Sequence, residues 1–283
     1  MKRILVPTDF SKTAAIALDT AADVAKRSGA EVVLLHVIEE VEDVSFNTDG
    51  QISSGLSGEE KLFMLKLIEK SRKQLEKVVK DPKYADIKLS GELKLGSAFN
   101  NIKDIIVDQK VDLVVMGSAG HTKLEEMLIG TNTEKVVRSS RSPVLVVNKK
   151  PASLNFKNIV YATAMSKDEE VFSRIVKRTQ QIYNSTVHLV RINTPGDFQR
   201  DTVVKDYMER FAKKLGLKNY TINVFNDLTV EEGVIRFADH IDAELIAMAT
   251  HGRTGFAHVL AGSVAEEVVS HAKRPVLTFV VRR

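Results

Sequence analysis

Hydrophobic positions in the first half of the chain alternate between two patterns. Short runs or alternations of apolar residues, typical of buried strands, are separated by stretches with an apolar residue every three or four positions, typical of helices. The strand-like segments are Arg3–Val6, Val32–Ile38, Ile87–Leu95, Leu113–Met116 and Val144–Val147. This order predicts an α/β fold with five parallel strands and helices on both faces of the sheet.

Two of the helical stretches have clear features. Ser11 can cap the first of them, and Gly29 can end it. The stretch 59–80 predicts a long amphipathic helix. The residues expected on its apolar face are Leu62, Leu65, Ile68, Leu75 and Val79.

The second half of the chain repeats the first. Leu113–Gly120 resembles Leu245–Gly252 at an offset of 132, and Ile4–Ser11 resembles Ile159–Ser166 at an offset of 155. The difference means that the first copy has 23 additional residues between Ile38 and Leu113. Repetition over this length predicts two tandem domains.

The boundary between the copies is expected in a short polar segment that contains Pro151. We predict a first domain at residues 1–149, a linker at 150–156 and a second domain at 157–283. Each domain is expected to be a five-stranded, doubly wound, Rossmann-like α/β domain.

Composition narrows the class of protein. The 283 residues include no cysteine, which excludes disulfide scaffolds, thiolate metal sites and cysteine nucleophiles. The 41 Lys and Arg nearly balance the 37 Asp and Glu, and tryptophan is absent, so we expect no nucleic-acid partner. No apolar run is long enough for a signal peptide or a membrane span, so we expect a cytoplasmic protein.

Residues that could bind a ligand lie directly after two of the predicted strands. In a doubly wound sheet, ligands bind beyond the carboxyl ends of the strands, at the point where the strand order reverses. Asp9 follows the first strand, where its carboxylate either binds a ligand or only caps the next helix. Gly117, Gly120 and Gly130–Thr131 follow the fourth strand, and they form either a phosphate site at a helix N-terminus or an ordinary turn and cap.

Other nucleotide and catalytic motifs are missing from the sequence. It contains neither the GxxxxGK[ST] phosphate loop nor a GxGxxG motif after the first strand, and neither a GxSxG elbow nor an HExxH helix. We interpret His36, on the second strand, as a core histidine, with a ligand role as the alternative.

Together, these segments resemble the universal stress protein family in its tandem two-domain form. The shared segments are ILVPTDFS, LLHVI, VVMGSAG, GT and SPVLVV. The family's nucleotide pattern is glycine, two residues, glycine, nine residues, glycine, and serine or threonine, and Gly117, Gly120, Gly130 and Thr131 match it. The resemblance implies an adenine nucleotide alpha hydrolase-like fold and ATP as the ligand, with Mg or Mn as a possible companion.

The resemblance also implies which residues contact the nucleotide. Thr8, Asp9 and Val37 would contact the adenine. Met116 and Gly117 would line the ribose. The phosphates would be held by Gly120, Gly130, Thr131 and Asn132. No residue stands out as catalytic or as a metal ligand, so the resemblance allows at most slow ATP hydrolysis or autophosphorylation.

The second copy departs from this pattern. Ala164 stands where the first copy has Asp9, and Ala249 stands where it has Gly117. A lost hydrogen bond to a charged group costs about 1.5–3 kcal/mol, so we predict that the second copy binds ATP weakly or not at all. The retained phosphate-side residues are Gly252, Gly262 and Ser263.

The resemblance implies that the last strands of the two domains pair with each other. Val144–Val147 and Val276–Val280 would then form a pseudo-dimer within one chain, and a homodimer stays open as a further assembly. The leading hypothesis is a stress-response protein regulated by ATP in its first domain. The alternatives are an enzyme that uses Asp9 or His121 as a base, and a nucleotide-independent scaffold or small-molecule or lipid binder with a mobile lid at Val44–Gly58.

Overall fold

The computed structural model describes residues 1–39, 58–118, 130–149, 151, 153–165, 169–251 and 263–281. The chain divides into two compact units, Met1–Met116 and Gly117–Arg283. Except for Gly58, the segment expected to be a lid lies outside the described residues.

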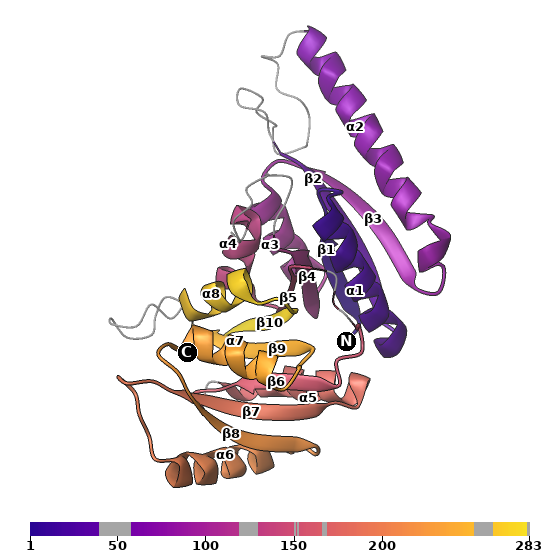
Figure 1. The fold of residues 1–283 in the computed structure, drawn as a ribbon. Helices are drawn as coiled ribbons and strands as arrows, with labels where there is room; N and C mark the ends of the chain where they lie inside the picture. Colours follow the sequence, from indigo (N-terminus) through magenta and orange to yellow (C-terminus); the bar gives the residue numbers. More distant parts are fainter. Residues whose placement is uncertain are drawn as a thin grey trace. The chain divides into compact units, whose positions relative to one another are not determined.

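The first unit contains a parallel sheet with the strand order β3-β2-β1-β4 (Figure 1). Ile4 of the central strand pairs in register with Val32 on one side and with Leu113 on the other. Ile4 is fully buried, because a central parallel strand is covered on both faces. The strands are β1 (Arg3–Pro7), β2 (Glu31–Ile38), β3 (Lys88–Leu95) and β4 (Leu113–Gly117).

Helices cover both faces of this sheet. The Oγ of Ser11 accepts a hydrogen bond from the backbone N–H of Ala14 at 3.2 Å, and Gly29 ends the first helix in the left-handed conformation with φ 70°. Both predicted ends of this helix are therefore confirmed. The helices are α1 (Lys12–Ser28), α2 (Gly58–Val79) and α3 (Ala98–Asp108), with a short 3₁₀ helix, η1 (Pro82–Tyr84), after α2.

The apolar face of α2 differs from the predicted one. The buried residues of α2 are Met64, Ser71 and Leu75, whereas Leu62 and Leu65 are exposed. The prediction was wrong for these two leucines because the stripe that packs on the sheet extends from Leu75 back to Met64. At Gly91 of β3, a Cβ atom would lie 2.8 Å from the Cγ of Leu75, so only a glycine allows this close approach.

The second unit contains a sheet with the strand order β5-β10-β9-β6-β7-β8. All neighbouring pairs are parallel except β5 and β10, which are antiparallel, with Val276 opposite Val146. The strands are β5 (Val144–Val147), β6 (Asn158–Ala162), β7 (Thr186–Asn193), β8 (Tyr220–Asn226), β9 (Leu245–His251) and β10 (Val276–Val281).

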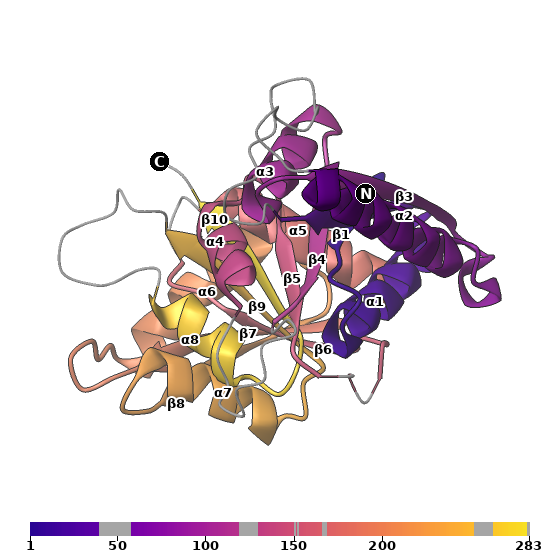
Figure 2. The same cartoon turned by 90° about the horizontal axis from the view of Figure 1, so that it is seen from above.

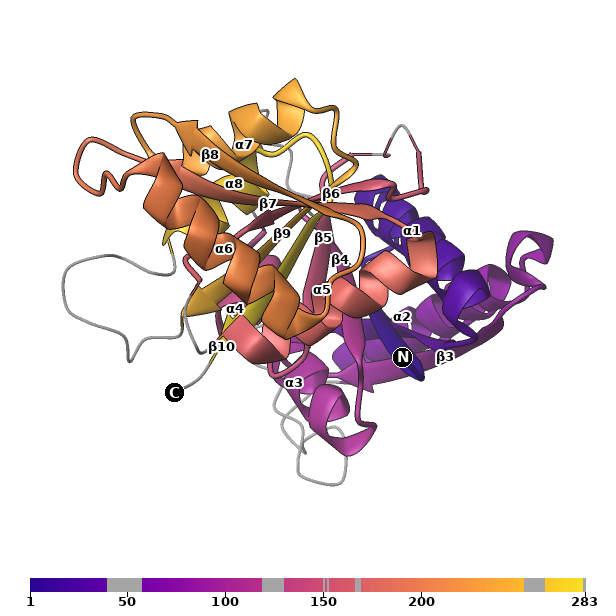
Figure 3. The ribbon, with the colours of Figure 1, turned by 90° about the horizontal axis from the view of Figure 1, so that it is seen from below.

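Four of the five helices described in the second unit pack in two pairs. α5 and α6 cover the face of the sheet that is in front in Figure 3, and α7 and α8 cover the face that is in front in Figure 2. The helices are α4 (Thr131–Ser139), α5 (Glu170–Tyr183), α6 (Asp201–Leu215), α7 (Val230–His240) and α8 (Ser263–His271). None of the described helices is both long enough and apolar enough to cross a membrane.

The element order confirms two tandem α/β copies. β1 to β5 alternate with α1 to α4, and β6 to β10 alternate with α5 to α8. Part of the additional length of the first copy lies in α2, which has 22 residues, whereas its counterpart α6 has 15. The two compact units meet at Met116, which comes before the boundary between the two sequence repeats. The reason is that α4 and β5 of the first repeat contact β10 of the second. The boundary at residues 150–156 stays a prediction.

Candidate functional site

The loop after β1 is tied down by hydrogen bonds from its own residues. The backbone N–H of Phe10 donates to Thr8 Oγ1 at 3.0 Å, and that of Ser11 donates to Asp9 Oδ1 at 2.9 Å. Phe10 has a positive φ of 62°, which these two bonds stabilise. Asp9 therefore holds the backbone of Ser11, and Ser11 itself is the N-cap residue of α1. A carboxylate can accept several hydrogen bonds, so this role leaves a second, ligand-binding role compatible with the geometry.

His36 supports the same loop from β2. Its Nδ1 lies 2.8 Å from the carbonyl oxygen of Thr8, and its ring centroid lies 4.4 Å from that of Phe10. The backbone N–H of Thr8 donates to the carbonyl of Leu35 at 2.8 Å. His36 is half-buried and not part of the core, and these contacts give it a structural role in holding the loop.

The first unit holds four of the residues assigned by resemblance, at the carboxyl ends of three strands. Thr8 and Asp9 follow β1, the half-buried Val37 lies near the end of β2, and the buried Met116 lies near the end of β4. β2 and β4 both pair with β1, so these strand ends are neighbours in the sheet. This is the place where doubly wound sheets bind ligands.

The second unit holds the glycine-rich residues on either side of the 119–129 segment. The N–H of Gly130 donates to the carbonyl of Ser118 at 2.5 Å, and the hydroxyl of Thr133 donates to the carbonyl of Gly117 at 2.9 Å. The N–H of Ser118 donates to the carbonyl of Val147 at 3.2 Å. The two ends of this glycine-rich loop are thus tied to each other at the start of α4.

Helix α4 begins at this point with a glycine as its N-cap residue. Gly130 has no side chain that could cap the helix, whereas Ser11 and Ser97 cap α1 and α3. The first-turn N–H groups of a helix have no partner carbonyl within the helix, and the helix dipole makes this end positive. Thr131 and Asn132 lie in this first turn, so the arrangement suits a phosphate group.

Four other residues named from the sequence lie outside the described residues, namely Gly120, His121, Gly252 and Gly262. In the part of the chain that the structure describes, no three His, Asp or Glu side chains gather into a metal-binding group.

The equivalent loop of the second copy keeps the backbone conformation of the first. Met165 has φ 57°, and its N–H donates to Thr163 Oγ1 at 2.9 Å, as Phe10 does to Thr8. Ala164 has no carboxylate, and a different residue supplies one. Glu169 is only 1% exposed and accepts a hydrogen bond from the N–H of Ala164 at 3.1 Å.

The Glu169 carboxylate also accepts hydrogen bonds from two hydroxyl groups. Thr163 Oγ1 donates to it at 2.6 Å and the Tyr161 hydroxyl at 2.9 Å. Burial, together with the nearby Glu169 charge, raises the pKa of Tyr161 well above its ordinary value. Glu169 is not among the residues expected from the sequence, because a glutamate at the start of a helix is usually explained by the helix dipole. The sequence did contain one signal for a buried acceptor. Besides the Thr163 hydroxyl, Tyr161 places a second hydroxyl near the end of an otherwise apolar strand.

Comparisons with known proteins extend over both copies. A model of the Universal stress protein family matches residues 1–148 and 155–280. A universal stress protein of Methanocaldococcus jannaschii is 38% identical over 155 residues, which are 53% of this chain and 96% of that protein. One from Synechocystis is 25% identical over 295 residues, covering 99% of this chain and 100% of that protein.

A solved structure has the same fold. The crystal structure of a universal stress protein from Archaeoglobus fulgidus aligns with a TM-score of 0.75 and 19% sequence identity. The alignment covers 99% of this chain and 96% of that chain, so the similarity in fold includes both copies.

Proposed function

The chain belongs to the universal stress protein family, and from that premise we propose that its first copy binds ATP as a regulatory ligand. Thr8, Asp9 and Val37 would contact the adenine, and Met116 and Gly117 would line the ribose. A Mg or Mn ion would accompany the phosphates. The residues that would hold the phosphates are Gly120, Gly130, Thr131 and Asn132.

The start of α4 is the observation that carries this proposal. Its N-cap residue is a glycine, and the N–H groups of the first turn, at the positive end of the helix, are the donors that we propose for the phosphates. The hydrogen bonds of Gly130 and Thr133 fix this end against Gly117 and Ser118. Such preorganisation reduces the conformational entropy that the protein would lose on binding a ligand.

The second copy is proposed to bind ATP weakly or not at all. Ala164 removes the carboxylate proposed to contact the adenine, and Ala249 adds a methyl group where the first copy has Gly117. The Glu169 carboxylate is already engaged by three donors of its own copy.

Regulation would follow from differential binding. A ligand that binds one arrangement of a protein more tightly shifts the population toward that arrangement. We further propose that the two copies act as a pseudo-dimer within one chain, and the antiparallel pairing of β5 with β10 supports this.

The number of nucleotides bound per chain tests the proposal. Small molecules released by denaturing the purified protein would be identified by mass and absorbance, and calorimetry would follow the addition of Mg-ATP. We expect about one adenine nucleotide per chain, because one copy keeps the full pattern. Two per chain would overturn the role given to Ala164 and Ala249, and neither release nor heat would overturn ATP binding itself.

An Asp9→Asn variant isolates the charge of this side chain. Its amide oxygen can still accept the hydrogen bond from Ser11, so the loop should keep its conformation. We expect the dissociation constant for ATP to rise by roughly 10- to 150-fold, as for a lost charged hydrogen bond. The matched control is Asp108→Asn at the end of α3, which should leave ATP binding unchanged. An unchanged affinity in Asp9→Asn would remove Asp9 from the site.

A further inference from the structure

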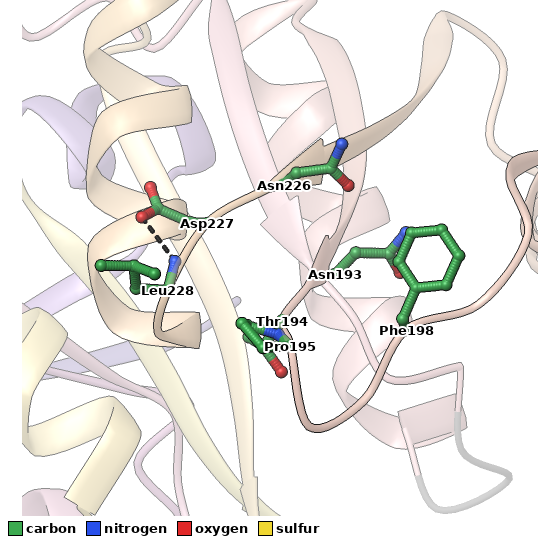
Figure 4. A pocket seen from close by; sticks show the side chains of 7 residues that line it. All are labelled: Asn193, Thr194, Pro195, Phe198, Asn226, Asp227 and Leu228. Carbon is green, nitrogen blue, oxygen red and sulfur yellow. Dashed lines mark hydrogen bonds between the residues drawn. The ribbon is translucent and has the colours of Figure 1, made fainter.

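A cavity lies at the carboxyl ends of β7 and β8 in the second copy (Figure 4). Its volume is about 390 Å³, within the range of roughly 300–1,000 Å³ that is usual for small-molecule sites. It is lined by Asn193, Thr194, Pro195, Phe198, Asn226, Asp227 and Leu228. None of these residues is among those assigned to ATP.

One wall of the cavity is the loop between β7 and α6. Arg191 is buried and forms an ion pair with Asp197 at 2.7 Å, and the buried Asn193 donates from Nδ2 to the carbonyl of Gln199 at 2.9 Å. The loop is therefore held at two points by buried polar side chains. Between these two points it presents Phe198, whose side chain is 68% exposed.

The opposite wall is the connection between β8 and α7. The Asp227 side chain is only 4% exposed and accepts hydrogen bonds from the N–H of Leu228 at 2.8 Å and from Arg236 at 3.1 Å. The N–H of Asp227 donates to the carbonyl of Asn193 at 3.0 Å, which joins the two walls. This wall presents Leu228, which is 73% exposed.

Two large apolar side chains are thus exposed on two firmly held loops that flank one cavity. Exposed apolar side chains on anchored loops are typical of binding sites, because burying them in a ligand contact removes them from water. Figure 4 shows the Phe198 ring and the Asn226 amide on one side of the view and Leu228 on the other. Asn226 and Thr194 can supply hydrogen bonds to a polar edge of a ligand.

The distribution of charged side chains around the cavity disfavours binding of an anionic ligand. No lysine, arginine or histidine is among its lining residues. The nearby guanidinium groups of Arg191 and Arg236 are paired with Asp197 and Asp227. A phosphate or carboxylate would therefore find no cation among the described lining residues to offset its loss of hydration.

We propose that this cavity binds a neutral aromatic small molecule, with its ring between Phe198 and Leu228 and a polar group at Asn226. The site is separate from the proposed ATP residues and does not depend on them.

Fluorescence titration with N-phenyl-1-naphthylamine, a neutral aromatic probe, tests this site in the full chain. We expect saturable binding of one probe per chain that Mg-ATP does not displace. Phe198→Ala and Leu228→Ala should each raise its dissociation constant by about tenfold. The anionic 8-anilinonaphthalene-1-sulfonate should bind more weakly than the neutral probe.

The matched control is Phe63→Ala, because Phe63 is an exposed phenylalanine on α2. Its titration should equal that of the unchanged chain. The proposal is overturned by lack of saturable binding, by unchanged affinity in the Phe198 and Leu228 variants, by an equal loss in Phe63→Ala or by tighter binding of the anionic probe. Nuclear Overhauser contacts from the bound probe to Phe198 and Leu228 in the unchanged chain provide a test that does not depend on any variant folding.

Discussion

The loops that follow β1 and β6 share one backbone conformation but obtain their carboxylate from different places. In the first copy, Asp9 accepts the N–H of Ser11 from within the loop. In the second copy, Glu169 reaches back to the N–H of Ala164. The second arrangement buries the carboxylate, which requires that its oxygens be hydrogen-bonded.

Replacing Glu169 should therefore destabilise the second copy. In Glu169→Ala, the hydroxyls of Tyr161 and Thr163 and the N–H of Ala164 would lose their common acceptor. We expect the free energy of unfolding, measured by urea denaturation, to fall by about 2–4 kcal/mol.

The neighbouring Glu170 gives the control for this measurement. Its side chain is half exposed and forms ion pairs with Arg174 and Lys214. Glu170→Ala should change the free energy of unfolding by no more than about 0.5 kcal/mol. Equal stability of the two variants would show that the buried carboxylate is not a structural requirement.

At the scale of elements, the strands were predictable because burial on both faces imposes continuous apolar runs. Leu113–Met116 and Val144–Val147 illustrate this, since each lies within the strand that it predicted. The face of α2 was not predictable in the same way. Leu62, Met64 and Leu65 are all apolar, and only the packing against β3 decides which of them is buried.

The same distinction applies to the candidate site. A carboxylate directly after a strand and a glycine before a helix are local signals, so Asp9 and Gly130 could be found from the sequence. The cavity beside Phe198 could not, because it depends on a loop and a strand connection that are close only in the fold. The ion pair of Arg191 with Asp197 is likewise visible only once β7 and its loop are placed.

The His188 side chain connects three strands of the second sheet. On β7, its Nε2 lies 3.2 Å from Asn158 Oδ1 of β6, and its Nδ1 lies 2.8 Å from Thr221 Oγ1 of β8. The amide oxygen requires a proton on Nε2, and Nδ1 of the neutral ring can then accept from Thr221. Burial lowers the pKa of His188 below 6.5, with partial opposition from the charge of Glu244.

A lowered histidine pKa means that the folded state favours the neutral ring. The unfolded chain takes up the proton first as the pH falls below about 6.5, so the stability from this group is present above that pH and is lost as the pH falls through the folded pKa. We expect urea denaturation to show this loss, and His188→Gln to reduce it. An NMR titration of the His188 ring that gave a pKa of 6.5 or higher would contradict this prediction.

At the scale of the whole molecule, elements of the first repeat complete the second compact unit. Besides the pairing of β5 with β10, Arg138 of α4 forms a two-point ion pair with Glu266 of α8, at 2.9 and 2.7 Å. The carboxylate of Glu266 raises the pKa of the Arg138 guanidinium above its ordinary value. The Arg138 and Glu266 side chains are 43% and 17% exposed, so solvent screens part of this attraction.

A double-mutant cycle measures this contact. We expect Arg138→Gln and Glu266→Gln to couple by about 0.5–1 kcal/mol at low salt, and the coupling to shrink in 1 M salt. The exchanged pair, Arg138→Glu with Glu266→Arg, should recover part of the stability that either single charge reversal loses. The absence of coupling at low salt would mean that β5 and the apolar contacts alone hold α4 in place.

The pairing of β5 with β10 has a consequence for how the protein can change over evolution. When two identical chains form such a pair, every mutation appears in both partners, and dilution separates them. Here both strands lie on one chain, so dilution does not reduce their local concentration and each mutation appears in one copy only. The gene can therefore keep Asp9 in one loop and accept Ala164 in the other, and each half is free to acquire its own ligand.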